Sequence, residues 1–322
     1  MSFLLSKVRK PNSGHKVDSK ETNPAHTRIV ATSYTSKKVD IPDDFLKLPA
    51  PDAQAITLHT VNFSESILPE YEGRYAVVLD NVISPSECKQ LIEYAEQSAG
   101  ASDEGVDNNG WKAAMVNAGV GREVMMTEYR NSDRIIWDDQ EVMNRLWERC
   151  TKVDGVLEEI GTLDHKPLIQ GRRGQNSRWI FSRLNERMRF LRYGPGQFFK
   201  EHCDGMYSTP DNTERSFVTL HLYLNDSVQA ITPGQRTSDR AVSFPPPVQT
   251  PNPLYLSDEP LEGGSTPFLS SDLSRRIDVH PKAGRVLLFQ HADLLHSGDY
   301  VTSGIKHTMR TDLMYKRVPK TD

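Results

Sequence analysis

The stretch that decides the fold is Arg192-Tyr-Gly-Pro-Gly-Gln-Phe-Phe-Lys-Glu-His-Cys-Asp204. It places two potential metal ligands two positions apart in an extended segment. Alternation along a strand puts His202 and Asp204 on one face and Cys203 on the other. By itself a His-X-Asp pair is a weak signal, because it also occurs as a surface hydrogen-bonded pair. With a second histidine from a distant strand, it would bind iron(II) on one side and leave positions open for co-substrate and oxygen.

The third ligand is expected at the end of a later strand. Residues 283–289 have the apolar character of a buried strand, and His291-Ala-Asp-Leu-Leu-His296 follows directly. His291-Ala-Asp293 repeats the His-X-Asp spacing. Spacing alone therefore leaves both His291 and His296 as candidates.

The sequence from Arg187 onward predicts short strands bounded by Gly, Pro, Asn and Asp, a pattern typical of a β-sandwich or small barrel. The predicted strands are 187–193, 216–224, 283–289 and 305–315. By parity, one face of the last strand carries Lys306, Thr308, Arg310 and Asp312, and one face of strand 216–224 carries Thr219, His221 and Tyr223. Between these strands, residues 226–260 are rich in proline, which predicts a long loop that could cover a site.

The N-terminal half predicts mainly helices. Residues 75–79 are β-branched and apolar, as in a strand, and Ser84-Pro-Ser-Glu87 is a capping box that opens a helix over 85–98. A second helix is expected from Asp138, with Val142, Leu146, Cys150 and Val153 on its buried face. Cys88 and Cys150 both fall on buried stripes, so they are interpreted as core residues.

Residues 1–50 are polar and rich in Lys, Ser, Thr and Pro, so they are expected to be a disordered basic tail before a single domain over 51–322. The net charge of −4 argues against a nucleic-acid partner. Three cysteines fit no zinc or disulfide framework and predict free thiols. No apolar run reaches the roughly 18 residues of a membrane span, and we expect a cytoplasmic protein with a possible nuclear pool. No pattern addresses the oligomeric state.

Several motifs resemble, in order and spacing, the 2-oxoglutarate/Fe(II) dioxygenases of prolyl-4-hydroxylase type. They are Tyr193, Gly196, the His202/Asp204 pair, Gly263-Gly264-Ser-Thr266, Pro281-Lys-Ala-Gly284 and His296-Ser-Gly-Asp-Tyr-Val-Thr-Ser-Gly-Ile-Lys306. The resemblance is strongest over 187–317 and weaker over 72–165. It implies an α+β, mainly β fold, with a double-stranded β-helix (jelly-roll) core over about 187–317 and helical support over 72–165. It also implies Fe(2+), 2-oxoglutarate, O2 and, as reductant, ascorbate.

The resemblance also assigns roles. It implies that His202, Asp204 and His296 hold the metal, with His296 preferred to His291 because it lies ten positions before Lys306. It implies that Lys306 pairs with the far carboxylate of 2-oxoglutarate, with Arg310 as the alternative. Tyr193 and Tyr223 are the hydroxyls expected nearest the co-substrate.

The leading hypothesis is oxidation of a C–H bond in a protein or small-molecule substrate, with succinate and CO2 as co-products. A non-catalytic sensor on the same scaffold and a cupin-like metalloenzyme that does not use 2-oxoglutarate are the alternatives. Seven arginines between 172 and 192 could attract an anionic substrate or form a solvated basic face.

Overall fold

The computed structural model describes residues 29–34, 36–99, 109–119, 121–164, 178–231 and 259–318. Most of the segment 226–260, and with it the predicted cover over the site, lies outside the described residues. So does the N-terminal part of the predicted tail, residues 1–28.

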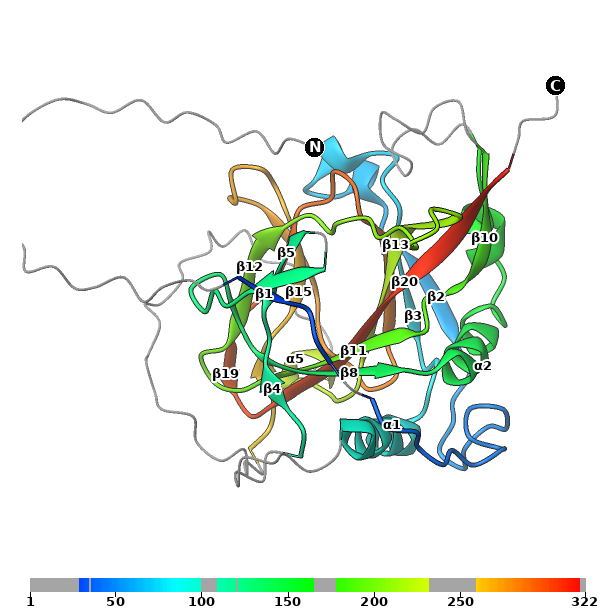
Figure 1. The fold of residues 1–322 in the computed structure, drawn as a ribbon. Helices are drawn as coiled ribbons and strands as arrows, with labels where there is room; N and C mark the ends of the chain where they lie inside the picture. Colours follow the sequence, from blue (N-terminus) through cyan, green and yellow to red (C-terminus); the bar gives the residue numbers. More distant parts are fainter. Residues whose placement is uncertain are drawn as a thin grey trace, which may run out of the picture.

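A large antiparallel sheet forms one wall of the molecule (Figure 1). Its strands, in spatial order, are β2 (Thr57–Thr60), β3 (Ala76–Asp80), β17 (Val286–Gln290), β13 (Glu214–Tyr223), β20 (Lys306–Val318), β11 (Arg187–Tyr193), β8 (Asp133–Asp138) and β4 (Lys112–Ala113). Two further strands extend it beside β20, namely β10 (Arg178–Leu184) and β9 (Thr162–Leu163).

A smaller antiparallel sheet lies on the other side of the molecule in Figure 1. Its spatial order is β16 (Arg276–Val279), β15 (Thr266–Leu269), β18 (His296–Gly298), β12 (Phe198–His202) and β7 (Arg130–Asn131). Two minor sheets complete the β structure: β1 (Ile29–Ala31), β6 (Arg122–Val124) and β5 (Val116–Gly119), and the pair β14 (Glu262–Gly263) and β19 (Val301–Ser303). The mainly β class expected from the sequence is confirmed.

The strands predicted from residue 187 onward are all present. Strand β11 matches its predicted range, while β13, β17 and β20 differ by one to three residues at their ends. Strand β17 begins three residues later than predicted, because Ala283 and Gly284 form a turn. Gly284 has φ 75°, and a Cβ there would lie 1.8 Å from the Ile83 carbonyl oxygen, so only glycine fits.

Helices α1 (Pro85–Ala99), α2 (Gln140–Cys150) and α3 (Val156–Ile160) pack with the large sheet in the main apolar cluster. The other described helical elements are α5 (Val228–Ile231) and the 3-10 turns η1 (Phe63–Glu65) and η2 (Pro69–Tyr71). The capping box of α1 is confirmed, because the Ser84 amide donates to Glu87 Oε2 at 2.7 Å and the Glu87 amide to Ser84 Oγ at 3.1 Å.

The predicted start of the second helix was wrong by one residue. Asp139, and not Asp138, caps α2, since its carboxylate accepts the Val142 amide at 3.0 Å. Asp138 instead ends β8 and binds Arg187 at 3.1 Å. Val153 lies beyond the end of α2, where it packs on the core from a turn.

The prediction that residues up to 50 form a tail was wrong for its C-terminal part. Val39, Phe45 and Leu46 are buried in the main core cluster. Two arginines of α2 hold this segment, because Arg145 donates to the Phe45 carbonyl at 2.9 Å and Arg149 to the Leu46 carbonyl at 2.8 Å. Strand β1 also lies within the range predicted to be disordered.

All three cysteines are free, with Cys88 and Cys150 buried as predicted and Cys203 exposed. Among the described helices, none combines the length and apolar character needed to cross a bilayer.

Candidate metal centre

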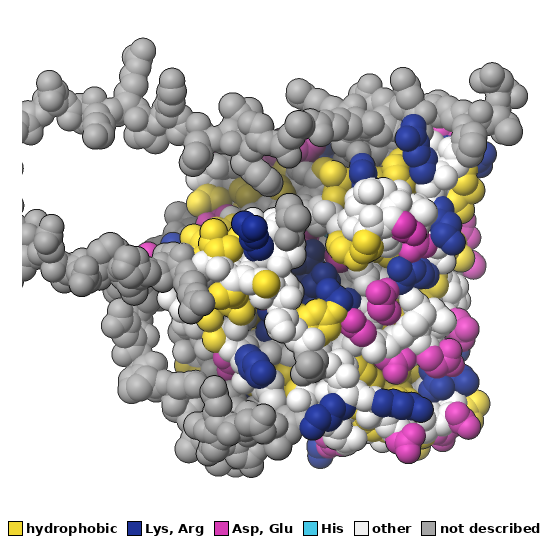
Figure 2. Space-filling view, viewed as in Figure 1, with side chains coloured by type: hydrophobic (Ala, Val, Ile, Leu, Met, Phe, Trp, Pro, Cys, Tyr) yellow, Lys and Arg dark blue, Asp and Glu magenta, His cyan; other side chains and the backbone are white. Residues whose placement is uncertain are grey.

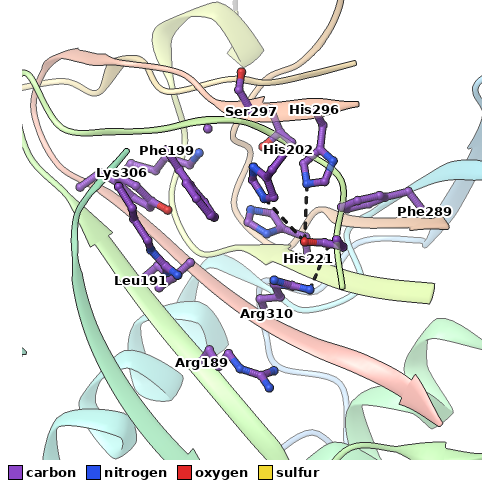
Figure 3. Close-up of a pocket in the computed structure, with 15 residues that line it drawn as sticks. Arg189, Leu191, Phe199, His202, His221, Phe289, His296, Ser297, Lys306 and Arg310 are labelled. Atoms are coloured by element: carbon purple, nitrogen blue, oxygen red, sulfur yellow. Dashed lines mark ion pairs between the residues drawn. The ribbon is translucent and has the colours of Figure 1, made fainter. Parts of the chain in front are cut away.

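Two histidines face each other across the smaller sheet. His202 ends β12 and His296 begins β18, and the antiparallel register pairs them directly. Their ring centroids lie 4.4 Å apart, and both rings point into the space between the two sheets (Figure 3). A bulge in β12 separates Phe199 from His202, which lets both side chains face the same cavity.

The backbone fixes which nitrogen of each histidine is free. His202 Nδ1 lies 2.7 Å from the carbonyl oxygen of Lys200, and His296 Nδ1 lies 3.1 Å from that of Leu294. A ring nitrogen that donates to a carbonyl carries the proton, so the Nε2 atoms hold the lone pairs. Burial, together with the neighbouring His202, lowers the pKa of His296 to about 3, so its ring is neutral at physiological pH.

Asp204 completes the group, two residues beyond His202. Its Oδ1 lies 3.6 Å from His202 Nε2 and 3.8 Å from His296 Nε2. Its Oδ2 turns away and accepts from Thr219 at 2.5 Å and from Arg310 at 3.0 Å. Burial would raise the pKa of Asp204, but Arg310 and the two histidines hold it well below its usual range. The carboxylate therefore stays ionised, with one oxygen held by the protein and the other directed between the histidines.

These three donors suit one ion. Their ligand atoms all lie within 4.8 Å of one another, close to the span that a single ion with bonds of about 2.1 Å bridges. Two neutral imidazoles and one carboxylate form the donor set of non-haem iron(II) sites, and catalytic zinc accepts it as well. The residues predicted as ligands are thus brought together, and they fit a metal.

His291 lies apart from this group. It is buried, and its Nε2 lies 3.5 Å from Asp312 Oδ1 instead. Asp312 also contacts Arg310 at 3.4 Å and Arg189 at 3.3 Å. A chain of charges therefore runs from Asp312 through Arg310 to the ligand Asp204.

Lys306 differs from the arginines beside it. Its side chain is buried in the cavity wall, with Nζ 5.2 Å from the centre of the Tyr193 ring. Among the described residues, no carboxylate lies within 4.0 Å of this ammonium and no hydrogen bond to it is formed. Burial lowers the pKa of Lys306 to about 8, with partial compensation by Asp299, which is itself bound to Arg276. The cavity thus contains a buried cation without an anionic partner among the residues that the structure describes.

The two candidate tyrosines have different positions. Tyr193 lines the cavity beside Lys306. Tyr223 is fully buried in a separate apolar cluster, where its hydroxyl donates to the Val279 carbonyl at 3.5 Å, and it does not line the cavity. Its ring centre nevertheless lies 5.8 Å from Lys306 Nζ. The structure therefore favours Tyr193 over Tyr223 as a hydroxyl near the co-substrate.

A cavity lies between the two sheets, and the three candidate metal ligands are part of its lining. Residues of three adjacent strands form one wall, in agreement with the predicted parity of β20 and β13. His221 belongs to this wall, with a buried Nε2 that has no hydrogen-bond partner among the described residues. Burial and then Lys306 keep the pKa of His221 well below its usual range, so it is neutral.

Sequence reasoning missed several residues of this lining. The residues that were not predicted to line the site are Arg130, Leu191, Phe199, Thr266, Phe289, Ser297 and Gly298, and Arg189 was predicted only as a member of the arginine cluster. Parity with Tyr193 along β11 would have indicated Arg189 and Leu191. Arg130 comes from β7, which reaches the site only through sheet pairing with β12.

The described arginines of the cluster 178–192 do not form a solvated basic face. Arg183, Arg187, Arg189 and Arg192 pair with acids at 3.3 Å or less, most of them from distant segments. Arg178 is the most exposed and lies 3.9 Å from Asp164. Arg172 and Arg173 lie outside the described residues.

No protein-family model and no curated relative matches the chain. Solved structures do. A viral collagen prolyl hydroxylase from Paramecium bursaria Chlorella virus-1 is 18% identical, with 76% of this chain and 97% of that chain covered and a TM-score of 0.40. A prolyl-4-hydroxylase from Pseudomonas putida is 13% identical, with 76% and 94% covered and a TM-score of 0.41.

A prolyl hydroxylase from Trichoplax adhaerens, solved with a peptide fragment of hypoxia inducible factor, is 13% identical, with 74% and 83% covered and a TM-score of 0.41.

Proposed function

We propose that this protein is an Fe(II)- and 2-oxoglutarate-dependent dioxygenase of prolyl-4-hydroxylase-like type. The observation that carries the proposal is that a group of two histidines and one carboxylate shares its cavity with a buried lysine that has no acid partner among the described residues. The histidines and the carboxylate suit iron(II), and the lysine suits the far carboxylate of 2-oxoglutarate. In this proposal the two facing sheets are the double-stranded β-helix of that family.

Each protein group then has a defined task. His202 and His296 present Nε2 to the metal, and Asp204 presents Oδ1, since its other oxygen is held by Thr219 and Arg310. Lys306 neutralises the co-substrate carboxylate in a buried setting where an unpaired charge would be costly. Arg310 is already bound to two acids, so it supports the ligand Asp204 and is not the anchor.

Bound iron and 2-oxoglutarate would supply oxygen activation: one oxygen atom enters succinate as CO2 leaves, and the other hydroxylates a substrate C–H bond. Leu191, Phe199 and Phe289 give the cavity an apolar part of its lining, which would limit the contact of bulk water with the reacting centre. The substrate is a protein side chain or a small molecule.

The test is succinate release by the purified protein with iron(II), ascorbate and 2-oxoglutarate, since turnover without substrate needs no knowledge of its identity. The expected result is succinate formation that depends on both iron and 2-oxoglutarate and is lost with His296→Ala. Binding of both without succinate would instead indicate a sensor. A protein that binds zinc but not 2-oxoglutarate would overturn the proposal.

A further inference from the structure

We infer that the substrate oxidised at this centre carries an acid group, a carboxylate or a phosphate, and that Arg130 binds it. The inference rests on the proposed function and adds to it a class of substrate. It follows from the charges that remain in the cavity once the metal and the co-substrate have been assigned their residues.

Arg130 is connected to the metal ligand His202 through the ring of Phe199. Its guanidinium carbon sits 4.7 Å from the centre of the Phe199 ring, and that ring stacks on the His202 imidazole at 3.9 Å. The position is set by sheet pairing, because Arg130 of β7 is the register partner of Phe199 in β12. The side chain therefore lines the cavity close to the centre where a substrate would react.

The other cations of the cavity are already accounted for. Arg310 is bound to Asp204 and Asp312, and Arg189 is bound to Asp312. In the proposed function Lys306 takes the far carboxylate of 2-oxoglutarate. Among the described residues, Asp204 is the one acid that lines the cavity, and it binds the metal. Within the part of the chain that the structure describes, no cavity carboxylate therefore remains for Arg130.

Arg130 itself makes little compensating contact. Its Nε donates to Ser132 Oγ at 3.3 Å, and within the described parts of the chain no carboxylate lies within 4.0 Å of it. Burial and the neighbouring guanidiniums lower the pKa of Arg130 to about 10, with partial compensation by Tyr193, so it remains protonated at neutral pH. Arg130 is half-buried, and a cation in this setting without an acid partner is stabilised by an incoming anion. A guanidinium binds carboxylate or phosphate through two parallel hydrogen bonds.

The surface around the entrance to the cavity is also positively charged. Figure 2 shows dark blue Lys and Arg side chains within the hollow near the middle of this face. Such a hollow raises the local concentration of anions. Beside Arg130 the lining is apolar, with Leu191 and Phe199, which suits the hydrocarbon part of an acid and not a second charge.

The experiment compares acids with their uncharged amides. Protein loaded with nickel(II), which does not turn over, is titrated first with 2-oxoglutarate and then with N-acetyl amino acids and their amides, and with a phosphate monoester. A second arm uses end-capped tripeptides with a central Glu or Gln. Binding is followed by calorimetry at low ionic strength, where charge contributes most. The variants are Arg130→Gln, Arg130→Lys and, as a control, Arg122→Gln, which removes an exposed arginine on β6.

Wild-type protein should bind at least one acid about 10- to 100-fold more tightly than its amide. Arg130→Gln should reduce this preference below about twofold, Arg130→Lys should keep part of it, and Arg122→Gln should leave it intact. A preference confined to the free acids and the phosphate monoester identifies a small-molecule substrate. A preference for the Glu peptide identifies an acidic peptide.

Equal binding of acids and amides by the wild type, or a preference that survives Arg130→Gln, would overturn the inference. The first titration keeps the two proposals apart. Absent 2-oxoglutarate binding refutes the proposed function alone, because the acid and amide titrations are repeated without metal and co-substrate and report on Arg130 independently. Nickel binding and thermal unfolding of each variant show whether the fold and the metal centre are retained.

Discussion

Replacement of Lys306 by methionine tests the central assignment of the site. Methionine matches the length of the lysine stem and removes the ammonium, so the packing against Tyr193 is retained. The structure assigns this ammonium no acid partner among the described residues, so the whole effect should appear on the co-substrate. Loss of one partner from a buried charge pair costs about 1.4 to 4 kcal/mol, equivalent to about a 10- to 1000-fold weaker affinity for 2-oxoglutarate.

The assay has two parts. The dependence of succinate release on 2-oxoglutarate concentration gives the apparent Michaelis constant, and calorimetry with nickel(II)-loaded protein gives the dissociation constant without turnover. Metal affinity should be unchanged, because Lys306 does not contact the ligands. The variant should unfold at the same or a higher temperature, since burial lowers the lysine pKa and the folded state is thereby destabilised by the charge.

Arg310→Met is the matched control. Its guanidinium holds the ligand Asp204 at 3.0 Å, so its loss should weaken metal binding as well as activity. If Arg310→Met weakens 2-oxoglutarate binding while metal affinity is normal, and Lys306→Met behaves like the wild type, the anchor is Arg310 and the reasoning above is refuted.

Four further outcomes follow from the site and the core. Alanine at any of the three ligand positions should abolish iron binding, measured by metal analysis after dialysis, while His291→Ala retains it. If His291→Ala loses iron and His296→Ala retains it, His291 is the third ligand. The affinity for 2-oxoglutarate should be constant below about pH 8 and fall about tenfold per pH unit above it, because binding must then return a proton to Lys306. With Lys306→Arg, the measured affinity should not change over the same pH range. Thr219→Val removes the hydroxyl that donates to Asp204 Oδ2 and should weaken metal binding by about 10- to 100-fold, and an unchanged metal titration would contradict this. Arg149→Met leaves Glu87 buried and unpaired and should lower the free energy of unfolding in urea by about 3 to 5 kcal/mol, and a loss below 1 kcal/mol would show that the pair contributes little.

The metal ligands and the cations on β20 could be predicted from the sequence better than the other residues that line the cavity. His202 and Asp204 could be identified because strand parity is a local property, and the same parity placed Lys306 and Arg310 on one face. Phe199 could not, since a bulge in β12 breaks the alternation there. Arg130 could not either, because its position depends on pairing between strands far apart in the chain.

The predicted N-terminal boundary of the folded domain was wrong for a related reason. Val39, Phe45 and Leu46 lie in a stretch without apolar periodicity, and their burial depends on α2 and the large sheet. Composition predicts whether a segment can fold alone, but it does not reveal a surface elsewhere on the chain that accepts it. The predicted helix start missed by one residue because Asp138 and Asp139 are both good caps, and only the end of β8 decides between them.

The contacts of α2 with the segment around Phe45 determine where the chain can be shortened. Arg145 and Arg149 donate to four carbonyls between residues 42 and 48, and the two side chains are nearly inaccessible to solvent. A fragment that begins at residue 51 would keep both guanidiniums and remove every one of these acceptors. The segment that looks dispensable in the sequence therefore supplies the hydrogen-bond acceptors of two buried guanidiniums. A stable recombinant fragment must begin before Val39.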